Sequence, residues 1–160
     1  MNIHPDFEEL LRLIEEHGIE YMIVGGYAVA YHGYPRFTKD IDLFFRLTND
    51  NALRLRQALV KFGFREEDLP LDAFTTTGNV LTFGIAPARV DLLNEIDGIT
   101  FDEARPNVVR GKYGNVEVTF IGLADCRMVG RRSVLRRHMS RPDARRCPRS
   151  FSLAVRGRFR

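Results

Sequence analysis

Two aspartates, Asp40 and Asp42, stand two residues apart in a segment, residues 38–45, where polar and apolar side chains alternate. This alternation is typical of a strand that carries both carboxylates on one face and its apolar residues on the other. The spacing separates the two side chains by about 6.5 Å, so both can reach one small group of cations. Magnesium is usually held by one or two carboxylates together with substrate phosphates. The segment therefore predicts a metal-binding strand, although an isolated Asp-x-Asp is more often a pair of solvated acids.

A glycine pair, Gly25-Gly26, lies a short distance before the aspartates. It follows an apolar run, residues 21–24, that is too short for a helix and indicates a buried strand. Residues 27–31 after the pair are typical of a short helix. A glycine turn between a strand and a helix lets backbone N–H groups approach a phosphate, and the positive end of the helix favours the anion. We therefore expect Gly25 and Gly26 to face the phosphates of a ligand.

Three polar residues, Arg36, Thr38 and Lys39, occupy the loop directly before Asp40. A cation in this loop can contact a triphosphate, because charge-assisted hydrogen bonds to phosphate are strong. We predict that the three residues help to bind a nucleotide. For Arg36, a solvated loop charge is an equally good interpretation.

A third aspartate, Asp91, lies in the predicted strand 89–93 between Val90 and Leu92. A charge in such apolar surroundings is costly unless it has a partner. The partner is either Arg89 or a loop N–H group, or it is the metal that Asp40 and Asp42 would bind. The sequence leaves both interpretations open, and Glu95 and Asp97 are reserve candidates for the third carboxylate.

Taken together, these motifs resemble those of a known superfamily. The run Val-Gly-Gly-Tyr-Ala at 24–28, followed by Arg-x-Thr-x-Asp-x-Asp at 36–42, is similar to the pattern of DNA polymerase β-type nucleotidyltransferases. Among these it most resembles small bacterial members, which include minimal nucleotidyltransferases and abortive-infection toxins of toxin–antitoxin pairs. Many members have serine after the first glycine, where its hydroxyl meets a phosphate, whereas this chain has Gly26.

The resemblance implies a metal-dependent enzyme that moves a nucleoside monophosphate from an NTP to an acceptor hydroxyl. Asp40, Asp42 and Asp91 would be its catalytic residues and would hold two Mg²⁺ ions, which Mn²⁺ can replace. Gly25 and Gly26 would meet the phosphates. The acceptor would be RNA, a protein or a small molecule, and an antitoxin is an implied partner. The sequence names neither the acceptor nor the preferred nucleotide.

The fold that must position these residues is predicted to be α/β (α+β), a small mixed, twisted sheet with helices packed on one side. Apolar periodicity predicts helices over 4–17 and from 48 or 49 to 62. Strands are expected at 21–24, 38–45, 79–85 and 89–93, and a hairpin at 108–121. Residues 65–78 are rich in turn signals and hard to assign. These elements would form one nucleotidyltransferase-like domain over residues 1–125.

Charge divides the 160-residue chain into two parts, because residues 1–125 carry a net −8 and residues 126–160 a net +11. The second part holds 12 arginines and one acid and has no sustained period. Three interpretations compete for it: a nucleic-acid-binding arm, a disordered segment, or out-of-frame translation of a truncated gene. A further alternative makes the whole protein a degenerate binding module that uses this basic tail and does no catalysis.

Composition excludes several other classes of protein. No apolar run approaches the roughly 20 residues that cross a bilayer, and the first residues lack the features of a signal peptide. The two cysteines, Cys126 and Cys147, form neither a metal-binding spacing nor a disulfide framework. We therefore expect a cytoplasmic protein without a membrane partner.

Overall fold

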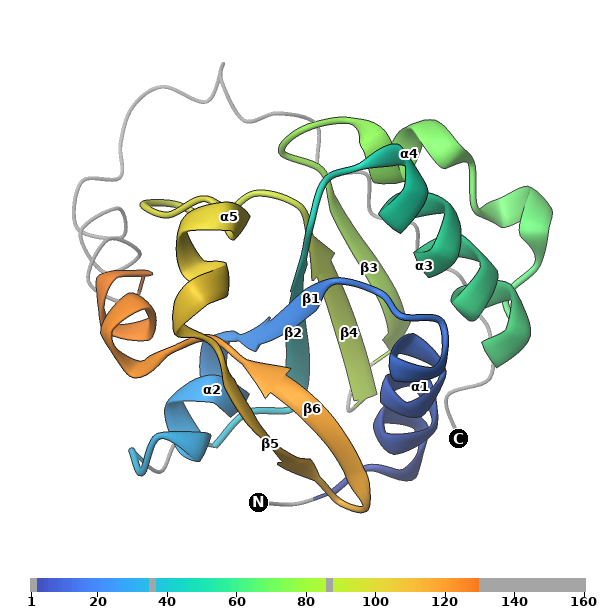
Figure 1. Ribbon diagram of the computed structural model, residues 1–160. Coiled ribbons are helices and arrows are strands. Elements are labelled where there is room, and N and C mark those ends of the chain that lie inside the picture. The colour runs from blue at the N-terminus through green and yellow to red at the C-terminus, as the bar shows by residue number, and fades with distance from the viewer. Residues whose placement is uncertain (1–2, 35–36, 86–87, 130–160) are drawn as a thin grey trace, which may run out of the picture.

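The computed structural model describes residues 3–34, 37–85 and 88–129 (Figure 1). The helices are α1 (Pro5–Glu16), α2 (Gly25–Tyr31), α3 (Asn49–Phe62), α4 (Leu71–Thr75) and α5 (Phe101–Ala104), with two short 3-10 helices, η1 (Glu66–Asp68) and η2 (Arg105–Asn107). The strands are β1 (Tyr21–Val24), β2 (Asp40–Phe45), β3 (Val80–Ile85), β4 (Ala88–Leu93), β5 (Val109–Tyr113) and β6 (Val116–Phe120). A further helix covers residues 123–129.

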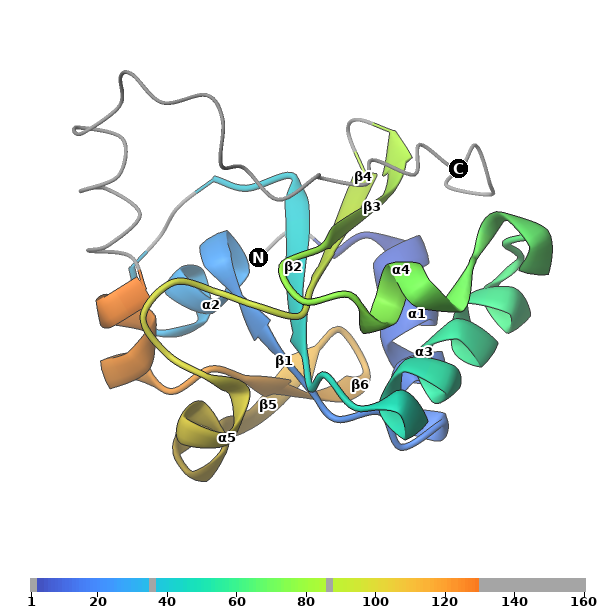
Figure 2. The same ribbon diagram turned by 90° about the horizontal axis from the view of Figure 1, so that it is seen from above.

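The described strands form one mixed sheet in the order β3-β4-β2-β1-β6-β5. Strand β2 runs parallel to β4, and β1 runs parallel to β6. The other three pairs are antiparallel. The predicted fold class, an α/β protein with a small mixed, twisted sheet, is confirmed. The helices, however, lie on both sides of the sheet and not on one side as predicted (Figures 1 and 2).

Helices cover the two faces of the sheet unequally (Figures 1 and 2). The long helices α1 and α3 pack together on one face, where β2 contributes its buried residues Ile41 and Leu43. The short helices α2 and α5 lie on the other side of β1 and β2 in both views. On that side Phe44 contacts Phe101 of α5, with ring centroids 5.4 Å apart. The aspartates of β2 alternate with the first set of side chains, so they face the side of α2 and α5.

Several element boundaries differ from the sequence prediction. Helix α2 begins at Gly25, so the glycine pair forms its first turn rather than a turn before it. Strand β2 begins at Asp40 and not at residue 38. The region that was hard to assign contains η1 and α4. Within the described chain, no helix is long and apolar enough to span a membrane.

The end of the described chain crosses the domain boundary that the charge pattern suggests. Helix 123–129 continues past residue 125, and Asp125 and Cys126 within it are both buried. The prediction of an Arg-rich, poorly ordered or out-of-frame tail concerns mainly residues 130–160, which lie outside the described residues.

Candidate active site

Strand pairing brings Asp42 and Asp91 side by side. Strands β2 and β4 are parallel neighbours, and in their register Asp42 lies opposite Asp91 while Asp40 lies opposite Arg89. Neighbouring strands are about 4.8 Å apart, and residues at even spacing share a face. All four side chains therefore project from the same side of the sheet, as the sequence predicts for the three carboxylates.

Arg89 forms ion pairs with two of these carboxylates. Its Nη2 atom is 2.8 Å from Oδ2 of Asp40 and 3.4 Å from Oδ2 of Asp91. The side chain of Asp91 is only 15% exposed, whereas that of Arg89 is 44% exposed. Asp91 thus has the partner Arg89 that one interpretation expects, and Asp42 is its cross-strand neighbour.

The other oxygen of Asp91 is fixed by the edge strand β3. The hydroxyl of Thr82 donates a hydrogen bond of 2.7 Å to Oδ1 of Asp91. Thr82 lies directly opposite Asp91 in the antiparallel β3–β4 pair. This hydrogen bond orients the Asp91 carboxylate. No local pattern in the sequence predicts it, because strand register is set by long-range pairing.

Gly25 lies directly against the carboxylate of Asp42. A Cβ atom placed on Gly25 would come within 2.0 Å of Oδ2 of Asp42, and Gly25 has a φ of +64°. Only glycine fits this contact without displacing Asp42, because a side chain would both clash and strain the backbone. Helix α2 also starts here without a side-chain cap on its N-terminal N–H groups. The glycine pair and the Asp-x-Asp strand are therefore parts of one site.

Thr38 fills the space beside the second glycine. A Cβ atom on Gly26 would lie 2.7 Å from Cβ and 2.9 Å from Oγ1 of Thr38. The Thr38 hydroxyl donates a hydrogen bond of 3.0 Å to the backbone carbonyl of Asp40. This contact gives a physical reason for glycine instead of serine at position 26, since the Thr38 hydroxyl lies close to where a side chain at position 26 would begin.

The loop before Asp40 contains two cations that were predicted to bind a nucleotide, Arg36 and Lys39. Arg36 lies outside the described residues. Lys39 is exposed, and its ammonium lies 5.9 Å from the ring centroid of Phe37, which is 82% exposed. Lys39 has no ion pair among the described residues that ties it to a carboxylate of the site.

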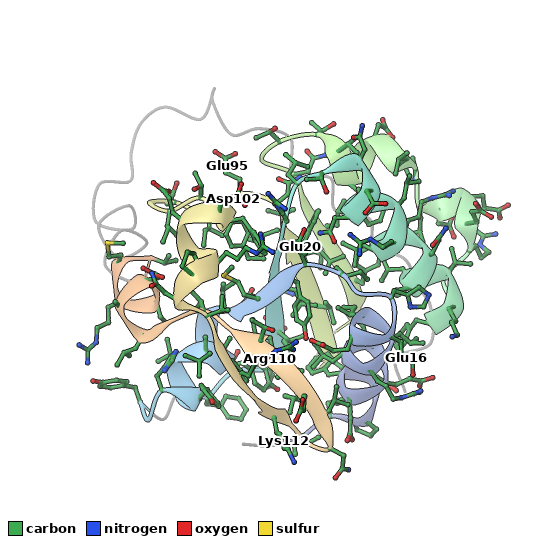
Figure 3. All side chains as sticks on the ribbon, in the orientation of Figure 1. Glu16, Glu20, Glu95, Asp102, Arg110 and Lys112 are labelled. Atoms are coloured by element: carbon green, nitrogen blue, oxygen red, sulfur yellow. The ribbon has the colours of Figure 1, made fainter. Side chains whose placement is uncertain are left out.

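Two other ionisable side chains, His32 and Glu95, lie outside this group of carboxylates. The Nε2 atom of His32 lies 2.7 Å from the carbonyl oxygen of Ile121, to which it donates, so this histidine ties α2 to the end of β6. Glu95 follows β4 and lines a pocket of about 580 Å³ together with Asp102. Figure 3 shows both acids at the α5 end of the molecule. The reserve candidate Glu95 therefore belongs to a different region from Gly25 and Asp42.

The donor set fits a hard divalent cation that arrives with substrate. Within the described part of the chain, no three His, Cys, Asp or Glu side chains are gathered closely enough to form a metal cage by themselves. Magnesium does not require such a cage, because one or two carboxylates and substrate phosphates complete its coordination. Asp40, Asp42 and Asp91 are the carboxylates on this face, and the positively charged guanidinium of Arg89 lies against two of them, Asp40 and Asp91.

Comparison with known proteins identifies the family of the chain. Residues 4–125 match the family model described as "Nucleotidyl transferase of unknown function (DUF2204)", and the chain belongs to this family. Among solved structures, the chain is similar to a crystal structure of a candidate nucleotidyltransferase from Thermotoga maritima, with 14% identity and a TM-score of 0.49. That match covers 86% of this chain and 95% of the other. No curated protein matches the chain.

Proposed function

We propose that the protein is a metal-dependent nucleotidyltransferase that moves a nucleoside monophosphate from an NTP to an acceptor hydroxyl. The observation that carries the proposal is the register of β2 and β4, in which Asp42 and Asp91 are direct neighbours beside Gly25. Membership in a nucleotidyl transferase family supports the reaction class.

Each residue of the site has a role in this proposal. Asp40, Asp42 and Asp91 hold the divalent metal, Mg²⁺ or Mn²⁺. When bound, the metal supplies positive charge that stabilises the triphosphate and the leaving pyrophosphate and makes the acceptor hydroxyl easier to deprotonate. The backbone N–H groups of Gly25 and Gly26, at the positive end of α2, receive the phosphates.

The bond changes define what the side chains must do. The acceptor oxygen bonds to the α-phosphorus, and the bond from that phosphorus to the bridging oxygen breaks, so pyrophosphate leaves with the electron pair. The hydroxyl proton must pass to a base. We assign this role to Asp91, because the hydrogen bond from Thr82 holds its carboxylate in a fixed orientation.

Nucleotide transfer can be tested by the position of the label. The purified chain is incubated with each NTP, labelled on either the α- or the γ-phosphate, together with Mg²⁺ and total cell RNA and protein. We expect a product labelled only from the α-phosphate and only without a chelator. Label from the γ-phosphate would indicate phosphoryl transfer, and no label with any NTP would refute the proposal.

The finer assignment rests on the sequence motifs. We propose that the protein is a small bacterial member of the DNA polymerase β-type superfamily and that it acts as the toxin of a toxin–antitoxin pair. Support comes from the glycine pair and the Asp-x-Asp strand, which meet at Gly25 and Asp42. Co-expression with the neighbouring gene tests the toxin role, since an antitoxin should restore growth and bind the chain.

A further inference from the structure

Arg89 stands where the proposed metal must bind. Its guanidinium contacts Oδ2 of Asp40 at 2.8 Å and Oδ2 of Asp91 at 3.4 Å. A divalent cation held by the same carboxylates needs those oxygens as ligands. The guanidinium and the metal therefore compete for one group of acceptors.

The backbone sets this arrangement and leaves Arg89 room to move. Arg89 and Asp91 are two residues apart on β4, so their side chains share a face. On the β2 side Arg89 pairs with Asp40, but on the β3 side its partner is Gly84, which has no side chain. With 44% of its side chain exposed, Arg89 can leave the carboxylates without disturbing the core.

The charge balance explains why such an arginine is useful. Carboxylates gathered on one face repel one another, and a nearby cation relieves the repulsion. Arginine also binds phosphate well, because its planar group donates two parallel hydrogen bonds. Free metal offers only a replacement cation for the aspartates, whereas a metal–nucleotide complex also offers a new anion for the arginine.

We propose that Arg89 neutralises the site in the free protein and yields its place only to metal that arrives with a nucleoside triphosphate, whose phosphates then bind the guanidinium. This inference rests on the proposed function. It makes metal binding and nucleotide binding interdependent: free metal binds weakly, and the NTP strengthens metal binding.

Direct binding measurements on the full chain test this dependence without relying on activity. Mn²⁺ affinity is measured by calorimetry, alone and with the α,β-methylene analogues of ATP, GTP, CTP and UTP. In the unaltered protein we expect at least one analogue to tighten Mn²⁺ binding by about tenfold or more. In Arg89→Gln we expect Mn²⁺ alone to bind about tenfold more tightly, and the gain from the nucleotide to shrink.

Two further variants make the result specific. Arg89→Lys keeps the charge and should leave the affinity for Mn²⁺ alone close to that of the unaltered protein. Arg110→Gln removes an arginine that pairs with Glu15 at 3.1 Å, on β5, and should change neither measurement. A tighter Mn²⁺ affinity in Arg110→Gln would mean that overall charge, and not the contact of Arg89, controls metal binding, which would overturn the inference.

The failure of this inference can be told from the failure of the proposed function. If the unaltered protein binds Mn²⁺ with nucleotide, and Arg89→Gln binds Mn²⁺ alone no more tightly, only the role of Arg89 is wrong. If no variant binds Mn²⁺ with any nucleotide, the metal-dependent function is wrong, and the inference falls with it.

Discussion

Asp42 and Gly25 lie so close together that each restricts the residue type at the other position. The carboxylate of Asp42 occupies the space that any side chain at position 25 would need, and the positive φ of Gly25 excludes most other residues independently. The glycine thus contributes to the site in two ways, by its backbone conformation and by the room it leaves for a carboxylate.

Replacing Gly25 with alanine should separate these two contributions when it is compared with Gly33→Ala. Gly33 also has a positive φ, +87°, but a Cβ atom there would meet nothing within 4 Å. Both variants should lose about 1–2 kcal/mol of unfolding free energy from backbone strain. Only Gly25→Ala should also lose Mn²⁺ binding in the presence of a nucleotide analogue, because it displaces Asp42. Equal Mn²⁺ affinity in both variants would show that Asp42 does not bind the metal.

Asp42→Asn should reduce metal-dependent transfer by orders of magnitude while the melting temperature stays similar or rises. The rise follows from the removal of one of several neighbouring negative charges. Asp50→Asn is the control, because it makes the same change of charge at a position away from the site. Asp50 pairs with Arg54 at 2.8 Å on the exposed side of α3. Transfer that survives in Asp42→Asn would exclude Asp42 as a metal ligand.

At the scale of elements, the first turn of α3 joins the ends of two site strands. Asn51 is fully buried, accepts a hydrogen bond from the backbone N–H of Glu20, and donates to the carbonyls of Glu20 and Arg46 at 3.0 and 2.9 Å. Thr48 caps the helix by accepting from the N–H of Asn51. One side chain therefore fixes the start of α3 to the residues just before β1 and just after β2.

Asn51→Ala should be destabilising. It leaves the backbone N–H of Glu20 without its partner, whereas the carbonyls of Glu20 and Arg46 keep hydrogen bonds from the backbone N–H groups of Arg46 and Thr48. An unsatisfied donor costs about 1–3 kcal/mol, so a loss of that size is expected. Asn49→Ala, at the exposed start of the same helix, should change stability by less than about 0.5 kcal/mol. Urea unfolding of both variants measures the difference, and equal losses would contradict the bridging role of Asn51.

The sequence predicts those helices and strands that show a clear apolar pattern or a clear terminating residue. Strand β1 matches its expected residues, and α3 ends before Gly63 as predicted. Helix α5 was not predicted, because four residues are too few to show a period. Its capping box, in which Thr100 and Glu103 exchange hydrogen bonds, is a local signal that could have located it. These bonds, first the one from the Thr100 backbone N–H, lower the pKa of Glu103.

For the candidate site, the sequence predicts which face of β2 the aspartates take but not the contacts that they make. Alternation along one strand placed Asp40 and Asp42 on a common face, and the burial argument required a partner for Asp91. The parallel register of β2 and β4, the hydrogen bond from Thr82 and the packing of Thr38 on Gly26 depend on segments far apart in the chain. Such contacts leave no local pattern in the sequence.

At the scale of the whole molecule, the acidic charge of residues 1–125 opposes the binding of an anionic nucleotide. Residues 1–125 carry a net −8, and an NTP adds further negative charge. In the proposed function, bound divalent metal and the arginine that it would release are the local means by which the site would accept a triphosphate despite this repulsion. Transfer should therefore depend steeply on the concentration of divalent metal.

The last described helix, 123–129, packs against the core on both sides of residue 125. Asp125 is 5% exposed and accepts a hydrogen bond of 3.1 Å from Asn107, Cys126 is 8% exposed, and Val129 packs against the core. A chain cut after Asp125 loses the second half of this helix. A chain cut after Val129 keeps every described contact and retains Cys126 as its single cysteine.

We predict that the two truncated chains behave differently. The chain that ends at Asp125 should lose about 2–4 kcal/mol of stability, because it no longer buries Cys126 and Val129. The chain that ends at Val129 should keep the stability and transfer activity of the full chain. Because burial raises the pKa of the Cys126 thiol, that thiol should react slowly with a disulfide reagent at neutral pH.

The same pair of chains tests whether the Arg-rich residues bind nucleic acid. If they do, the chain that ends at Val129 should bind RNA more weakly than the full chain and with a shallower dependence on salt, since fewer phosphates are neutralised. If they do not, RNA affinity should be equal in both. A rapidly reacting Cys126 or a lowered melting temperature in this chain would contradict the prediction, because it would mean that residues beyond Val129 contribute to the folded core.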